Sequence, residues 1–146
     1  MNNEENFAVN IERTFDAPVN KVWQAWVDGE IMKKWSCPNG FEIIEHSGEA
    51  KVGSNYSVTM KSEFYSGTVV GKYLEISKPN KLVMSHCWDN EDGTFTAETI
   101  ITVLLEDLRD KTKMNFTQTG FENSKRSDSH HSGWTETFDK LEVLLK

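Results

Sequence analysis

The sequence predicts an α+β domain in which one curved antiparallel sheet of about seven strands covers a long C-terminal helix. Between residues 41 and 121, strand-like runs are separated only by short turns, so neighbouring strands should pair antiparallel. After residue 123, apolar residues recur at helical spacing with charged residues between them. Because a sheet and an amphipathic helix each need a partner for the apolar face, the two are expected to pack together.

A strand and two short helices are expected at the start of the chain. Residues 7–15 alternate between apolar and polar side chains, which is the period of a half-buried strand. Pro18 suits the first turn of a helix, and residues 19–27 carry one continuous apolar helical face. Gly29 interrupts this pattern, and a further helical turn is expected before the turn-forming residues 37–40.

About six further strands and one long helix complete the predicted layout. Turn residues separate the strands at 48–53, 66–67, 78–80, 89–93 and 106–111. Beyond residue 123, one helical face carries Trp134, Phe138, Leu141 and Leu145. Because the sequence has no internal repeat and no linker, residues 1–146 should form a single domain.

Charge and cysteine content exclude several classes of partner. The chain carries 23 Asp and Glu against 16 Lys and Arg, a net charge of −7, with no basic block, so neither nucleic acid nor an anionic membrane is expected to bind. No apolar run approaches the 18 or more residues of a membrane span. The polar, acidic residues 1–6 are unlike a secretory signal, so we expect a cytoplasmic protein in which Cys37 and Cys87 are free thiols.

Motifs typical of catalysis and metal binding are absent from the sequence. It contains no Gly-x-Ser-x-Gly elbow, phosphate-binding glycine loop or His-Glu-x-x-His. Residues 89–93 are similar to the start of a calcium loop, but Ile100 occupies the position of the bidentate Glu, so a hairpin turn is expected. His130 and His131 point about 100° apart on a helix, which favours a helix start or a surface role over a shared metal. We assign no catalytic residue, metal or cofactor.

Alternating faces of three expected strands form a candidate binding surface. If these faces look toward the long helix, the interior contains the Tyr56 hydroxyl, the His86 imidazole and the Gln118 amide, and each needs a partner. A cavity with a bound molecule would supply partners, and so would the protein itself or buried water in a filled core; both alternatives stay open. The residues assigned to ligand binding are Trp35, Tyr56, Val58, Met60, Met84, His86, Trp88, Phe116, Gln118, Trp134 and Phe138.

Short motifs spread over nearly the whole chain occur together in one known family. They are Arg13-Thr-Phe-Asp-Ala-Pro18, Val22-Trp-Gln-Ala-Trp26, Lys34-Trp35 with Pro38, Gly71-Lys-Tyr-Leu-Glu-Ile76 with Pro79 and Leu82, Thr112-Lys-Met-Asn-Phe-Thr-Gln-Thr-Gly-Phe121, and His131-Ser-Gly-Trp134. In this order they resemble the bacterial proteins similar to the C-terminal domain of the activator of the heat-shock protein 90 ATPase. That family is part of the START-like, or SRPBCC, superfamily.

The resemblance implies a helix-grip fold, in agreement with the layout above, and an apolar or lipid-like ligand held between the sheet and the C-terminal helix. The sequence departs from the family pattern at two places. The family often has Trp-Trp where this chain has Trp35-Ser36, so Ser36 leaves room near the pocket mouth. It often has Asp-x-Arg-Pro-Gly-Gly where this chain has Glu49-Ala-Lys-Val-Gly-Ser54, with one glycine fewer in the turn.

Three functions follow from these observations. The first is a small-molecule binding domain in which His86 and Gln118 orient a polar group of the ligand. The resemblance also suggests a chaperone cofactor, with a chaperone as partner. The runner-up to the binding domain is a polyketide cyclase-like or hydrolase-like enzyme, in which His86 and an acid act as general acid and base, although the sequence places no carboxylate with certainty beside His86. A monomer or weak dimer is expected, and the aromatic pair at 64–65 fits either a pocket rim or a dimer patch.

Overall fold

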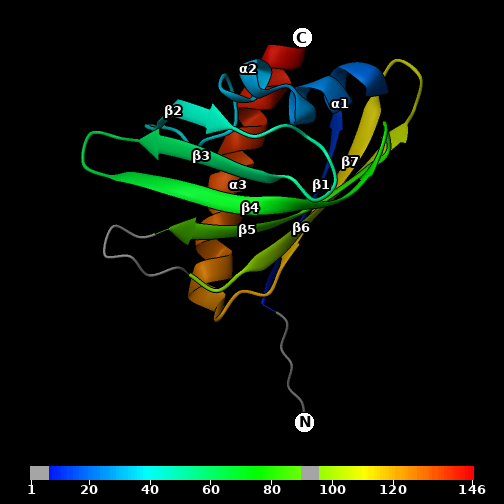
Figure 1. Ribbon diagram of the computed structural model, residues 1–146. Helices are drawn as coiled ribbons and strands as arrows, with labels where there is room; N and C mark the ends of the chain where they lie inside the picture. The colour runs from blue at the N-terminus through cyan, green and yellow to red at the C-terminus, as the bar shows by residue number, and fades with distance from the viewer. Residues whose placement is uncertain (1–6, 90–95) are drawn as a thin grey trace.

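The computed structural model describes residues 7–89 and 96–146. Within these residues the strands are β1 (Ala8–Phe15), β2 (Glu42–Ser47), β3 (Asn55–Lys61), β4 (Ser66–Ser77), β5 (Lys81–Asp89), β6 (Thr99–Asp107) and β7 (Thr112–Thr119). The helices are α1 (Val19–Val27), α2 (Gly29–Met32) and α3 (Ser124–Leu145). All the strands belong to one curved antiparallel sheet, and α3 lies across one of its faces (Figure 1).

The sheet order is β1-β7-β6-β5-β4-β3-β2, so the first strand pairs with the last one. Ala8 lies opposite Thr119 and Phe15 lies opposite Thr112, so the first and last strands of the chain are neighbours in the sheet. Every other neighbouring pair is consecutive in sequence, as short connections require. The predicted helix-grip fold, with two short helices after the first strand, is confirmed.

Most of the predicted turns lie between strands, but the one placed at residues 66–67 is wrong. Ser66 and Gly67 belong to β4, and the hairpin before them closes where the Ser62 amide donates to the Tyr65 carbonyl at 2.7 Å. A Cβ at Gly67 would lie 2.7 Å from the Tyr65 hydroxyl and 3.0 Å from the Trp88 ring. The glycine therefore makes room for two aromatic side chains. Of the turn expected at 89–93, residues 90–93 lie outside the described residues.

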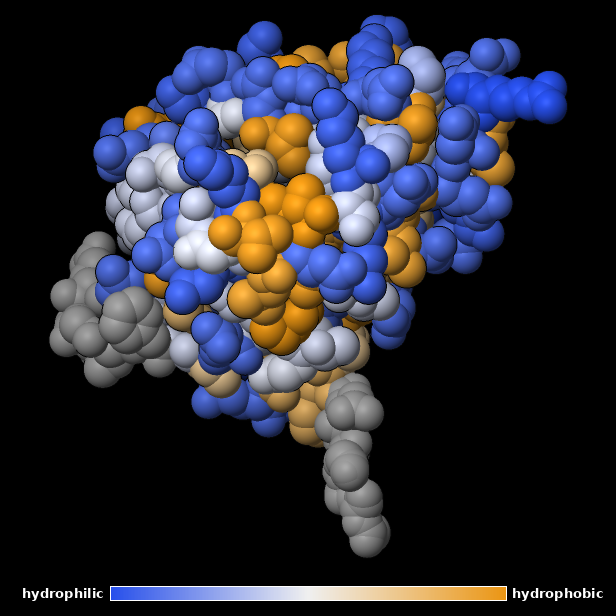
Figure 2. Space-filling model, turned by 45° about the vertical axis from the view of Figure 1, so that its right-hand side comes forward, coloured by the Kyte–Doolittle hydropathy of each residue, from blue (hydrophilic) through white to orange (hydrophobic). Residues whose placement is uncertain are grey.

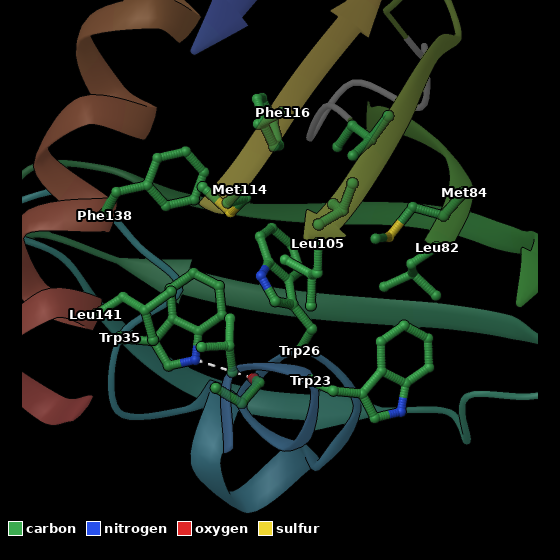
Figure 3. Close-up of a cluster of buried hydrophobic side chains, with 14 of the residues drawn as sticks. Trp23, Trp26, Trp35, Leu82, Met84, Leu105, Met114, Phe116, Phe138 and Leu141 are labelled. Carbon is green, nitrogen blue, oxygen red and sulfur yellow. Dashed lines mark hydrogen bonds between the residues drawn. The ribbon is translucent and has the colours of Figure 1, made fainter. Parts of the chain in front are cut away.

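The two short helices are separated by one capping residue. Asp28 follows α1, and its carboxylate accepts hydrogen bonds from the amides of Glu30 and Ile31 at the start of α2. This satisfies amide groups that have no partner inside the helix. Just beyond α2, the indole N–H of Trp35 donates to the Ala25 carbonyl at 3.0 Å and ties the two helices together (Figure 3).

The long helix packs differently along its two halves. In its C-terminal half, Phe138, Leu141 and Leu145 are buried against the sheet. The guanidinium of Arg13 on β1 reaches Asp139 at 2.6 Å and Glu142 at 2.7 Å and fixes this half to the sheet edge. The N-terminal half faces a hollow.

The face of the molecule in Figure 2 is mainly hydrophilic. An apolar patch lies near the centre of this face and is bordered by hydrophilic residues (Figure 2). Among the described residues, the most exposed large apolar side chains are Phe64, at 90% exposure, and Val143, at 72%. No helix in the described part of the chain is both long and apolar enough to cross a membrane.

Candidate ligand-binding site

A cavity of about 370 Å³ lies between the sheet and the N-terminal half of α3. This volume falls at the lower end of the range of small-molecule pockets. Most of its wall is apolar, with aromatic rings from α1, β3, β5 and α3. The residues predicted to bind ligand that line it are Tyr56, Val58, Met60, Met84, His86, Trp88 and Trp134.

Strand alternation explains why these side chains meet in one wall. Side chains two residues apart on a strand share a face, so the cavity side of β3 carries Tyr56, Val58 and Met60. Pairing then aligns the rows of neighbouring strands, since Val58 lies opposite Val69 and Val69 lies opposite Trp88. The result is one continuous apolar surface across three strands.

The remaining predicted residues lie behind this wall. Trp35, Phe116, Gln118 and Phe138 are fully buried, and none of them lines the cavity. Trp35 and Phe138 surround the ring of Trp26, with centroid distances of 4.9 and 6.1 Å (Figure 3). Trp26 itself lines the cavity, so these rings hold its indole in place from behind.

Partly exposed side chains form the rim of the cavity. Phe41 and Tyr65 meet edge to face, with their ring centroids 6.3 Å apart, and Pro38 and Ser36 continue the rim after α2. Ser36 therefore lies beside the opening, where the family often has a second tryptophan. Of the aromatic pair at 64–65, Tyr65 belongs to the rim and Phe64 points into solvent.

A buried hydrogen-bond network fixes the polar end of the wall. The Trp134 indole donates to Oε1 of Gln118 at 2.8 Å, which turns the amide nitrogen of Gln118 toward Thr99 Oγ1 at 2.9 Å and His86 Nδ1 at 3.3 Å. Because Nδ1 of His86 accepts this bond, the neutral ring carries its proton on Nε2. Burial lowers the pKa of His86 to about 3, and repulsion from a protonated His130 acts in the same direction.

Tyr56 finds its partner in the backbone. Its hydroxyl donates to the Ser85 carbonyl at 2.6 Å and crosses over Gly71, where any Cβ would collide with the hydroxyl. Gly71 belongs to one of the family motifs, and this crossing explains the need for a glycine there. The polar groups of Tyr56 and Gln118 thus find hydrogen-bond partners within the protein. The cavity is present as well, so the two alternatives do not exclude each other.

His130 is part of the wall, which corrects the helix-start or surface role favoured for it from the sequence. The Trp88 indole donates to Nε2 of His130 at 3.3 Å, and Nδ1 lies 2.9 Å from the Arg126 carbonyl. Burial lowers the pKa of His130. The available signal was its position four residues before Trp134, which puts both side chains on the same helical face.

Charged and metal-binding groups are scarce at the cavity. Within residues 7–89 and 96–146, no group of three His, Cys, Asp or Glu side chains could hold a metal ion. No Asp or Glu among these residues lines the cavity, so the hydrogen-bond partner of His86 is an amide and not an acid. Cys37 and Cys87 are both free thiols.

The comparison with known proteins assigns the chain to a family. The family model described as Activator of Hsp90 ATPase homolog 1-like protein matches residues 16–146. The chain belongs to this family. The match covers nearly the whole domain, including every element that lines the cavity, and it confirms the resemblance carried by the short motifs.

Solved structures of several bacterial proteins share the fold across almost their full length. The AHSA1 protein of Silicibacter pomeroyi has a TM-score of 0.87 at 19% identity, covering 94% of this chain and 96% of that one. A Chromobacterium violaceum protein has a TM-score of 0.84 at 22% identity, covering 95% and 96%. A Staphylococcus epidermidis protein has a TM-score of 0.81 at 21% identity, covering 98% and 92%. No curated protein matches the sequence.

Proposed function

We propose that this member of the Activator of Hsp90 ATPase homolog 1-like family binds a small apolar molecule between its sheet and α3. The supporting observation is the cavity of about 370 Å³ with its largely apolar and aromatic wall. A ligand there would remove apolar surface from water, which stabilises the complex by roughly 25 cal/mol per Å² before ordering costs are subtracted.

Each group of wall residues has its own part in this proposal. Apolar contacts come from the cavity faces of β3 and β5 and from Trp134 on α3. His86 meets a polar group of the ligand, and Gln118 positions the His86 ring through its amide. Trp35, Phe116 and Phe138 act from behind the wall, because they are buried and hold Trp26 and Trp134 in place.

The direct test is native mass spectrometry of the purified protein, followed by denaturing extraction of whatever travels with it. We expect a reproducible apolar compound at one copy per chain. An empty protein that also fails to bind neutral apolar probes of about a dozen non-hydrogen atoms, the size that this space holds, would contradict the proposal.

Gly133 offers a way to close the site without touching the packed core. It lies on α3 and lines the cavity, and a Cβ there would meet only Pro38, at an ordinary 3.5 Å. Gly133→Leu should therefore place a branched side chain in the cavity opening. We expect this variant to lose the retained compound and to bind apolar probes at least tenfold more weakly, as measured by calorimetry.

Gly133→Ala is the matched control. It removes the same glycine but adds one carbon, so probe affinity should stay within about twofold. Because alanine is a better helix former than glycine, the free energy of unfolding of this variant, measured by urea titration, should be about 0.5–1 kcal/mol higher than that of the wild type. If both variants bind the apolar probes as tightly as the wild type does, the probes do not pass or occupy the part of the cavity next to Gly133.

A further inference from the structure

The cavity wall carries formal charge at one end only. Among the described residues that line it, Arg126 is the one charged side chain, and its charge is positive. Arg126 lies in the first turn of α3, and its side chain is 41% exposed, so more than half of it is covered. An occupant of the cavity would therefore meet a cation near this end and apolar surface elsewhere.

The neutral groups at this end add a hydrogen-bond donor. Arg126, His86 and His130 also line a second, smaller hollow, together with Glu122, so these side chains lie near one another. His130 is engaged on both ring nitrogens. His86 accepts through Nδ1, so its Nε2–H is a donor, and no described residue bonds to that atom. Arg126 and His86 thus both present N–H groups and call for an oxygen acceptor.

The carboxylate of Glu122 comes closest to the Arg126 guanidinium at Nε, which is one of the three guanidinium nitrogens. Its Oε1 lies 3.8 Å from Nε of Arg126, and its own side chain is 56% exposed. An exposed pair at this distance is weak and screened by salt. The terminal amino groups of Arg126 keep the planar fork that binds a carboxylate through two parallel hydrogen bonds.

We infer that the ligand is an amphipathic monocarboxylate, with its carboxylate at Arg126 and its apolar body along Met84, Ile101 and Trp134. This inference rests on the proposed function, because it names the chemical class that the same cavity takes. The space holds roughly a dozen waters, so the body has about a dozen non-hydrogen atoms. A cationic ligand meets repulsion at Arg126, and a neutral one forms no ion pair with the guanidinium.

The experiment compares molecules that differ only in the head group. Decanoate, 1-decanol and decylammonium share one chain, and 1-naphthaleneacetate and 1-naphthaleneethanol repeat the comparison with an aromatic body. All are titrated below their micelle concentrations into the full chain by calorimetry at pH 7. We expect each carboxylate to bind about tenfold more tightly than its alcohol, and decylammonium to bind most weakly.

Two substitutions in α3 test whether Arg126 is responsible for the preference for carboxylates. Arg126→Gln should reduce carboxylate affinity about tenfold and leave alcohol affinity within twofold. Lys125→Gln removes the same charge from the neighbouring residue, which is exposed and does not line the cavity, so it should change neither.

The outcomes separate this inference from the proposed function. If the alcohols bind as tightly as the carboxylates, or if Arg126→Gln and Lys125→Gln behave alike, the carboxylate class is wrong and the apolar site stands. If no member of either series binds, the proposed function fails and the inference fails with it.

Discussion

Replacing Phe138 with alanine is expected to lower the free energy of unfolding by about 3–5 kcal/mol. Phe138 is fully buried on α3. Its ring stacks on Trp134 at 5.4 Å and meets Phe116 edge to face at 5.2 Å, with Trp26 and Trp35 within 6.4 Å. Because Phe138 contacts both the sheet and the helical segment after β1, its loss leaves a void that neither side can fill. Such a loss is a large share of the 5–15 kcal/mol typical of one domain.

Urea unfolding followed by tryptophan fluorescence measures this change. Val143→Ala on the same helix is the control, because Val143 is 72% exposed and its replacement should change stability by no more than about 0.5 kcal/mol. A loss below about 1 kcal/mol for Phe138→Ala would mean that α3 is not packed against the aromatic cluster as described.

Elements with strong periodicity could be predicted from the sequence. The alternation of residues 7–15 and the helical spacing from Trp134 to Leu145 each repeat over several turns or pleats, and the structure contains β1 and α3 there. The turn at Ser66-Gly67 could not be placed this way. A glycine that makes room for aromatic rings has the same local signature as a glycine in a turn, and only the tertiary neighbours Tyr65 and Trp88 distinguish the two.

The sequence predicts which strand side chains face the long helix, but not which of them reach the cavity. Period two correctly grouped the side chains of β3 and β5 that share the inner face. The same rule cannot tell that Phe116 is packed behind Trp134 while Met84 faces the hollow, because both point toward the helix. That difference arises where the C-terminal half of α3 is fixed to β1 by Arg13 and the N-terminal half lies over the cavity.

Lowering the pH from 7 to 5 is expected to reduce the free energy of unfolding by about 2 kcal/mol through His86 alone. Burial lowers its pKa in the folded protein to about 3, with repulsion from a protonated His130 acting in the same direction. In the unfolded chain the ring takes up a proton near pH 6.5. The unfolded state therefore binds more protons between these values, and stability falls as the pH drops from about 6.5 toward 3.

Two half-buried histidines, His46 and His130, should also make the protein less stable at low pH. Burial lowers the pKa of His46 on β2 and of His130 on α3, so both also favour the folded state at neutral pH. The wild-type difference between pH 7 and pH 5 should therefore be at least that expected from His86 alone. Urea titrations at the two pH values, with the same fluorescence probe, measure it directly.

A substitution isolates the contribution of His86. His86→Asn keeps an acceptor near the position of Nδ1 for the Gln118 amide but cannot take up a proton, so its loss of stability from pH 7 to pH 5 should be about 2 kcal/mol smaller than that of the wild type. His131→Asn is the control, because that ring is exposed on α3 and stays in water in both states. If His86→Asn and the wild type lose the same free energy on acidification, the ring of His86 is not held neutral by burial in the folded protein.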